Sequence, residues 1–125
     1  MWNIERTDEI AQWIKGLDDD AKEALLKGFI ILKEIGPSLG RPHVDSVKRS
    51  RHHNMKELRI QNKLRLFRIF FVFDPLRNVI LLIGGDKKGD RKFYQKMIPV
   101  ADQLYDKYLV KLKETYESTV KKGDI

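Results

Sequence analysis

The sequence contains no cysteine, which excludes disulfide bonds and thiolate chemistry. Proteins of the reducing cytosol commonly show this absence, and the cytoplasm is the predicted location of this chain. The first six residues lack the apolar core of a secretory signal peptide. The longest apolar runs, residues 69–73 and 79–83, are too short to cross a bilayer, so no membrane association is expected.

Acidic residues are scarce in one block of the chain. Residues 41–70 contain nine lysines and arginines against two acids, and 9 − 2 = +7 equals the net charge of the whole 125-residue chain. A charge that served solubility alone would be interspersed along the sequence. The block therefore predicts a surface for a polyanion, first of all nucleic acid. A solvated loop without a partner remains the alternative.

Internal repeats, low-complexity tracts and domain linkers are also missing. Hydrophobic residues make up 42% of the chain, which is enough for a buried core at this length. We therefore expect one domain over residues 1–117, followed by a frayed tail over residues 118–125.

Two helices are predicted near the N-terminus. Thr7 caps the first, which has an apolar stripe at helical spacing and ends at Gly16. Asp18 precedes the second, whose apolar residues recur every three to four positions as far as Ile35. A Gly-Pro pair then ends it, so the two helices form an αα-hairpin.

The rest of the chain predicts mainly strands. Four segments in all have the composition and alternation of strands, namely residues 2–5, 55–60, 64–73 and 78–83. The last three are joined by short turns and should form antiparallel hairpins. A helix is predicted from about residue 91 to 117, with a break at Ile98-Pro99. The predicted class is α+β, with the order β-α-α-β-β-β-α. Helices should cover one face of a three-stranded antiparallel sheet and leave the other face open for a ligand.

The strand at residues 64–73 is apolar on both faces, yet Arg68 lies in its middle. A buried guanidinium is costly unless it meets an anion or lies at an opening. Arg68 is therefore a candidate for binding phosphate. An ion pair with Glu57 on the neighbouring strand is the alternative. The two interpretations are compatible, because a carboxylate can hold an arginine in place for a phosphate.

Three motifs, taken together in this order and spacing, resemble the RelE/ParE superfamily of toxins from bacterial type II toxin–antitoxin pairs. The nearest branch is that of the phage-associated HigB-like toxins. The motifs are Glu57-Leu58-Arg59, Arg68-Ile69-Phe70-Phe71 and the aliphatic strand that runs into Gly84-Gly85-Asp86-Lys87-Lys88. The similarity spans nearly the whole chain. The chain departs from many members in having no histidine after His53 and in its longer C-terminal helix.

The resemblance implies a metal-independent endoribonuclease, an mRNA interferase, in which the 2′-hydroxyl of the RNA attacks the adjacent phosphate. Arg68, assisted by Arg59, would stabilise charge on that phosphate. Lys87 would neutralise the phosphate or move a proton. Glu57 would orient the arginines or act as a base. Tyr94 would stack on a base or take the place of the missing histidine, and core packing is its alternative role.

The resemblance also implies partners. These are a cognate antitoxin, usually a small helix-turn-helix protein, and mRNA, free or on the ribosome. Further basic residues are expected to bind RNA, namely Lys48, Arg49, Arg51, Lys56, Arg65 and Lys88. No cofactor or metal is expected, because the three histidines have no cysteine or suitably spaced carboxylate beside them. Two alternative functions remain open at this point: a ParE-like inhibitor of DNA gyrase, and a basic nucleic-acid-binding module without catalysis.

Overall fold

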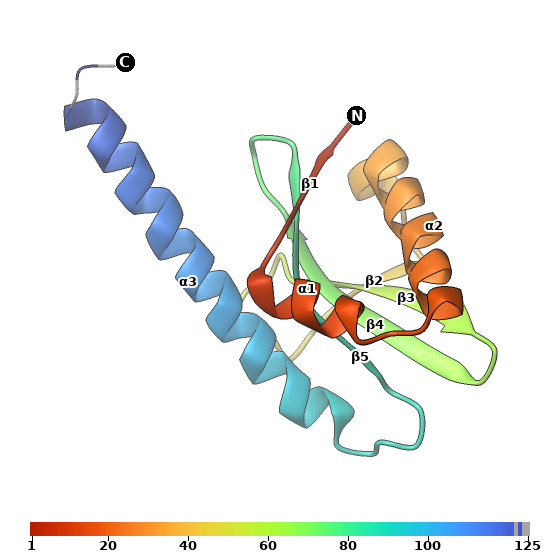
Figure 1. Cartoon of the computed structure of the whole chain (residues 1–125). Coiled ribbons are helices and arrows are strands. Elements are labelled where there is room, and N and C mark those ends of the chain that lie inside the picture. Colours follow the sequence, from red (N-terminus) through yellow and green to blue (C-terminus); the bar gives the residue numbers. More distant parts are fainter. Residues whose placement is uncertain (122, 124–125) are drawn as a thin grey trace.

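The order of helices and strands is seen in a computed structural model, which describes residues 1–121 and 123. In chain order these are β1 (Asn3–Arg6), α1 (Asp8–Lys15), α2 (Asp19–Ile35), a 3-10 helix (Gly36–Ser38), β2 (Val44–Ser46), β3 (Lys56–Asn62), β4 (Arg65–Phe73), β5 (Asn78–Asp86) and α3 (Phe93–Lys121) (Figure 1). The predicted α+β class, the N-terminal strand, the helix pair and the C-terminal helix are confirmed. The two N-terminal helices begin at the predicted caps, since the side chains of Thr7 and Asp18 each accept a hydrogen bond from the first turn.

The sheet has five strands in the order β1-β5-β4-β3-β2. β1 runs parallel to β5, and the other neighbours are antiparallel. The three predicted antiparallel strands are confirmed as β3, β4 and β5, but the prediction of a sheet with only three strands is wrong, because β1 and β2 extend it at its two edges. β2 has only three residues, too few to show an alternating pattern. The pairing of β1 joins segments about 75 residues apart, as in Asn3 opposite Asn78, and local sequence carries no signal for such a pairing.

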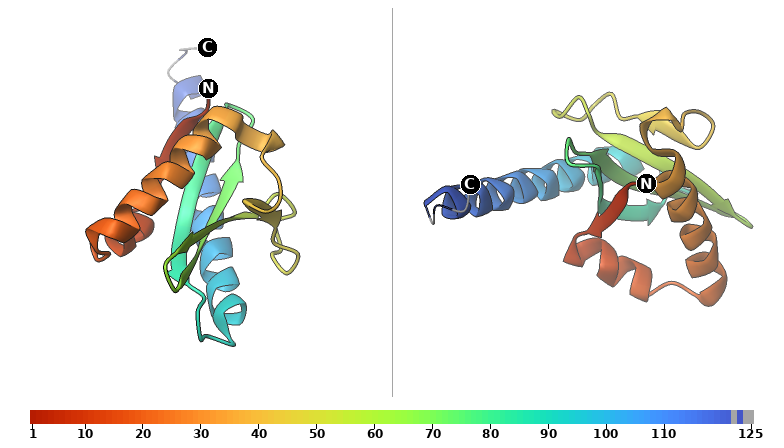
Figure 2. Two further views of the ribbon diagram at one scale, coloured as in Figure 1. Left: turned by 90° about the vertical axis from the view of Figure 1, so that its right-hand side faces the viewer. Right: turned by 90° about the horizontal axis from the view of Figure 1, so that it is seen from above.

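Helices cover both faces of the sheet. Figure 2 shows α1 and α2 on one side and the first half of α3 on the other. The predicted open face is therefore wrong. The reason lies in β4, where Phe70 and Val72 point away from α1 and α2 and are buried among residues of α3 such as Ile98 and Ala101. Burying a second apolar face of the sheet requires a second helical layer.

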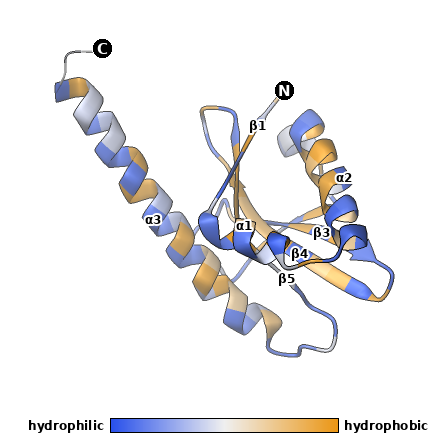
Figure 3. Cartoon of the chain, in the orientation of Figure 1, coloured by the Kyte–Doolittle hydropathy of each residue, from blue (hydrophilic) through white to orange (hydrophobic). Residues whose placement is uncertain are grey.

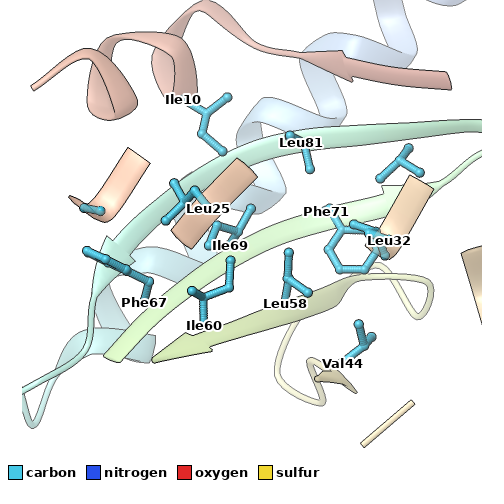
Figure 4. Close-up of a cluster of buried hydrophobic side chains, with 12 residues drawn as sticks. Ile10, Leu25, Leu32, Val44, Leu58, Ile60, Phe67, Ile69, Phe71 and Leu81 are labelled. Carbon is cyan, nitrogen blue, oxygen red and sulfur yellow. The ribbon is translucent and has the colours of Figure 1, made fainter. Parts of the chain in front are cut away.

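The core beneath α1 and α2 is the larger cluster of buried residues. Figure 4 shows side chains from both helices, among them Ile10 and Leu25, meeting Phe67, Ile69 and Leu81 of the central strands. β4 and β5 are correspondingly the most continuously apolar segments of the chain (Figure 3). These two strands form the rigid centre on which the polar side chains described below are mounted.

Helix α3 is continuous from Phe93 to Lys121, so the predicted break at Ile98-Pro99 is wrong. Pro99 removes one backbone hydrogen bond, but Ile98 and Ala101 beside it are buried and hold the helix against the sheet. The helix also includes residues 118–121, which we had expected in a frayed tail; residues 122, 124 and 125 of that tail lie outside the described residues. The second half of α3 extends beyond the sheet (Figure 2, right). No helix in the described part of the chain is both long and apolar enough to span a membrane.

A register shift in β5 sets which face its last residues occupy. Phe70 pairs with Ile83 and Phe71 with Leu81, so one additional residue of β5 stands between the two pairs. After the shift, Gly84 lies under the ring of Trp13 on the α1 face, and Gly85 lies opposite Arg68 on the α3 face. The bulge thus brings the end of β5 next to Arg68.

We expect Gly84→Ala to destabilise the fold by about 1–3 kcal/mol, the usual range for an overpacked core. A Cβ atom at this position would overlap the indole ring of Trp13, which is itself packed against the core. Urea unfolding measures the loss. Gly40→Ala is the matched control, because nothing lies within 4 Å of a Cβ atom built there. Equal stability of the two variants would contradict the close packing of α1 on β5.

Candidate functional site

Polar side chains from β3, β4, the residue after β5 and the start of α3 meet on the α3 face of the sheet. Arg59 of β3 pairs with Arg68 of β4, which pairs in turn with Gly85 of β5. Glu57 lies two residues before Arg59 and therefore shares its face. Lys87 directly follows β5, and Tyr94 lies in the first turn of α3. The structure thus brings together all five side chains that the sequence analysis named as candidates for catalysis: Glu57, Arg59, Arg68, Lys87 and Tyr94.

Glu57 is at the centre of this group, and its residue is only 4% exposed. The Tyr94 hydroxyl donates a hydrogen bond of 2.8 Å to its Oε1 atom. The Nε atom of Arg68 lies 3.5 Å from the same oxygen, and an Nη atom of Arg59 lies 3.5 Å from Oε2. One buried carboxylate is therefore held by two guanidinium groups and a phenol, as the alternative interpretation of Arg68 predicted.

The two arginines keep donor capacity that the protein does not use. Arg59 pairs with Asp45 at 3.2 Å as well as with Glu57, and Arg68 donates to the carbonyl oxygen of Phe67 at 3.0 Å. Among the described residues, neither Nε atom has a hydrogen-bond partner, although both are buried. The Arg68 side chain is 12% exposed, so it is not completely sealed in the core.

Tyr94 links Glu57 to Lys87. Burial, and then the hydrogen bond to Glu57, raises the pKa of the Tyr94 hydroxyl above its usual value of 10.0; the nearby Arg68 guanidinium opposes this effect. The hydroxyl therefore stays protonated at neutral pH and donates to the carboxylate. The Lys87 ammonium lies 5.8 Å from the centre of the Tyr94 ring, within the range of a cation–π contact.

A pocket opens beside Glu57 and Tyr94. It is bounded by the loop before β3 and by the start of α3, and its lining includes Lys48, Arg49, Arg91 and Gln95. Within the described part of the chain, no carboxylate lies within 4.0 Å of a charged nitrogen of Lys48, Arg49 or Arg91. Three unpaired cations beside a buried polar cluster make this pocket suited to a polyanion.

The sequence analysis missed Arg91 and Gln95. Arg91 lies in the turn just before α3, and Gln95 lies in the first turn of α3, directly after Tyr94. The available signal was their closeness in the sequence to Tyr94, which was already a candidate.

Two of the basic residues expected to bind RNA lie on the other face of the sheet. The guanidinium of Arg65 contacts Asp18 at 2.7 Å and stacks over Phe67, on the side of α1 and α2. Lys56 alternates onto that same face and donates to the hydroxyl of Ser46 at 3.1 Å. Successive residues of a strand point to opposite faces of the sheet, so these two side chains lie on the face away from Glu57 and Arg68. RNA bound at Glu57 and Arg68 would not reach them.

The other expected RNA-binding residues divide between the pocket and its surroundings. Lys48 and Arg49 line the pocket, and Lys88 is exposed next to Lys87. Arg51 instead turns toward α3, where it contacts Asp106 and lies 3.9 Å from Asp102. Arg51 is paired with these two carboxylates, so we do not propose that it binds RNA.

The histidines do not come together. His52 contacts Asp106 at 2.7 Å and packs edge-on against Tyr105. Among the residues that the structure describes, no three histidine, aspartate or glutamate side chains form a group that would hold a metal ion.

Residues 12–106 match the model of a family described as "Phage derived protein Gp49-like (DUF891)". The chain belongs to this Gp49-like family. The match covers the second half of α1, all of α2, the whole β2–β5 region and the first half of α3, and so includes the polar group and the pocket. The predicted resemblance to phage-associated proteins is confirmed.

Two proteins of Mycobacterium tuberculosis (strain ATCC 25618 / H37Rv) are similar to this Gp49-like chain. One, named "Putative toxin HigB2", is 40% identical over 110 residues, which cover 86% of this chain and 55% of that protein. The other, named "Putative toxin HigB3", is 43% identical over 102 residues, which cover 81% of this chain and 88% of that protein. The chain therefore spans about half the length of the first relative and most of the second. No solved structure matches the chain.

Proposed function

We propose that this Gp49-like protein is the toxin of a type II toxin–antitoxin pair, and that it acts in the cytoplasm as an endoribonuclease that cuts mRNA and arrests growth. The observation that carries the proposal is the pocket, in which the unpaired cations Lys48, Arg49 and Arg91 surround an entrance to Glu57 and Tyr94. The names of the two relatives support the toxin assignment. The proposal places a single-stranded ribose-phosphate chain along these cations.

The proposed chemistry uses the RNA, this chain and water. The ribose 2′-hydroxyl gives up its proton to water as its oxygen bonds to the adjacent phosphorus, the bond from phosphorus to the 5′-oxygen breaks, and the 5′-oxygen takes up a proton from water. The products are a 2′,3′-cyclic phosphate and a 5′-hydroxyl, and negative charge accumulates on the phosphate oxygens during the step. Arg68 and Lys87 stabilise that charge, because a guanidinium presents two parallel donors to a phosphate and an ammonium presents a compact charge. Arg59, fixed by Asp45 and Glu57, adds to the positive potential.

Glu57 and Tyr94 have a positioning role in this scheme. Glu57 accepts a hydrogen bond from Tyr94 and contacts both arginines, so it holds these donors in place. A preorganised set of donors stabilises developing charge without rearranging during the reaction. Tyr94 also lines the pocket, and its ring is a candidate surface on which a base can stack.

A partner follows from the proposed function. A toxin of this kind requires an antitoxin, and we propose a small helix-turn-helix protein that neutralises the chain. The net charge of +7 and the unpaired cations of the pocket favour an acidic segment in that partner.

Expression of the chain alone, with mapping of RNA 5′ ends, tests the function. We expect growth arrest together with new 5′ ends in messenger RNA, and an inactive Arg68→Ala variant as the matched control. New ends that appear only in translated messages would place cleavage on the ribosome. Arrest with intact RNA would contradict the nuclease and favour a gyrase inhibitor. No arrest, with salt-dependent RNA binding, would indicate a non-catalytic binding module.

Arg91→Ala should weaken RNA binding about three- to tenfold and lower the dependence of log affinity on log salt by roughly 1. Arg91 supplies one of the unpaired cations of the pocket. Fluorescence anisotropy with a 2′-O-methyl RNA, which cannot be cut, measures both quantities. Arg65→Ala removes the same charge from the opposite face of the sheet. Its RNA affinity and its salt dependence should both stay within twofold of the values of the parent protein. An equal effect of the two variants would show that only total charge matters.

A further inference from the structure

The loop between β2 and β3 is attached to α3 by a buried carboxylate. Asp102 is 4% exposed and lies in the third turn of α3. Its Oδ1 atom accepts a hydrogen bond of 2.5 Å from the Ser50 hydroxyl, and its Oδ2 atom accepts one of 3.3 Å from the backbone N–H of Arg51. Burying a carboxylate is costly unless it is paired and hydrogen-bonded, and here the loop supplies the donors.

Further contacts attach the same loop to the same face of α3. His52 contacts Asp106 at 2.7 Å, and the side-chain amide of Asn54 donates to the Tyr105 hydroxyl at 3.1 Å. Residues 50–54 are therefore held at several points along one helix. At the base of the loop, Val47 and Met55 are buried, and their backbones are joined by a 3.0 Å hydrogen bond.

Between these attachments, and next to Ser46 and Val47, Lys48 and Arg49 line the pocket. Their side chains are long and carry several rotatable bonds, so a free loop would spread their charges over a wide volume. With residues 47 and 50 both held, the backbone between them has little freedom. α3 itself carries Tyr94 and Gln95 on the opposite side of the pocket.

We infer that Asp102 is a positioning residue that orders the loop and thereby holds Lys48 and Arg49 where the phosphates of the RNA bind. This inference rests on the proposed function and adds to it a residue that does not touch the substrate. Asp102 acts through the loop, because it contacts Ser50 and Arg51 and is not among the residues that line the pocket. Removal of the carboxylate should loosen the loop and weaken RNA binding, while the rate of the chemical step on bound RNA changes little.

For Asp102→Asn, electrostatics alone and the inferred loop ordering predict opposite changes in RNA affinity. The substitution keeps the size of the side chain and makes the protein more positive by one charge, so electrostatics alone predicts tighter RNA binding. The inference predicts that RNA affinity falls about three- to tenfold. The magnitude of the slope of log affinity against log salt should also fall by roughly 1, because Lys48 and Arg49 are no longer held in place. Asp19→Asn, an exposed position at the start of α2 on the other face, carries the same charge change and is the matched control.

Three measurements separate the possible outcomes. Hydrogen exchange of the free protein should become faster at residues 48–54 in Asp102→Asn and in Ser50→Ala. Ser50→Ala removes the hydroxyl that donates to Asp102 and leaves the net charge unchanged. Binding of 2′-O-methyl RNA, free or on the ribosome, should weaken in both variants. Single-turnover cleavage at saturating protein should stay within about threefold of the parent.

A variant that binds RNA as tightly as the parent, or an unchanged exchange rate in the loop, overturns the inference while the proposed function stands. A parent that neither binds nor cuts RNA overturns the proposed function and the RNA-binding part of the inference together. Weaker binding in both variants and unchanged binding in Asp19→Asn support the inference.

Discussion

Arg68→Ala is expected to lower RNA cleavage by roughly a hundredfold or more, the usual loss when one preorganised donor to a developing charge is removed. Arg68 is the one arginine of the central strand on the α3 face, and its guanidinium is held by Glu57 and by the carbonyl oxygen of Phe67. Single-turnover cleavage of an RNA that the parent cuts measures the effect. Growth arrest on expression should be lost as well.

The Arg68→Ala result must be separated from loss of the fold. Circular dichroism and urea unfolding should show a folded variant, because Arg59 still pairs with Glu57. Arg68→Lys keeps the positive charge but loses the planar pair of donors, so its cleavage should lie between those of Arg68→Ala and the parent. A folded Arg68→Ala protein that cuts RNA within threefold of the parent would exclude Arg68 from the chemistry.

Glu57→Ala is expected to lower the free energy of unfolding by about 3–5 kcal/mol, the range seen when one partner of a buried ion pair is removed. The variant would leave two guanidinium groups and the Tyr94 hydroxyl around a cavity without an anion. Against a total stability of about 5–15 kcal/mol for an ordinary domain, this is a large loss. Urea unfolding monitored by tryptophan fluorescence measures it.

The Glu57 prediction has an internal control in the double variant. Glu57→Ala with Arg68→Ala removes an anion and a cation together, so it should be less destabilised than the sum of the two single variants. Glu57→Gln keeps the shape of the side chain and one acceptor, and should lose less stability than Glu57→Ala. A loss below about 0.5 kcal/mol in Glu57→Ala, the size of an ordinary surface substitution, would show that the carboxylate does not organise the site.

Much of the candidate site was predictable because strand geometry is local. Alternation along β4 separates Arg65 from Arg68, and the motif Glu57-Leu58-Arg59 puts its two charged residues on one face. What alternation does not indicate is which face carries the site. The predicted RNA-binding group therefore mixed residues of both faces, and the ion pair between Arg65 and Asp18 shows that Arg65 lies on the face covered by α1 and α2.

Other parts of the site depend on contacts between distant segments. Asp102 and Arg51 are 51 residues apart, and their contact turns Arg51 away from the pocket. The bulge in β5 sets Gly85 beside Arg68, and the pairing of β4 with β5 decides where the bulge falls. Arg91 lines the pocket because the start of α3 lies next to Glu57.

The sequence by itself determined the α+β class, the start of both N-terminal helices, the central position of the strand that carries Arg68, and the family resemblance. These follow from caps, apolar periodicity and motif order, which act over a few residues or are carried by the order of the chain. The tertiary structure alone decided that β1 pairs with β5, that α3 covers the second face, and which cations reach the pocket. Each of these depends on the closure of long loops, whose free energy is set by the packing of the whole chain and not by any local segment.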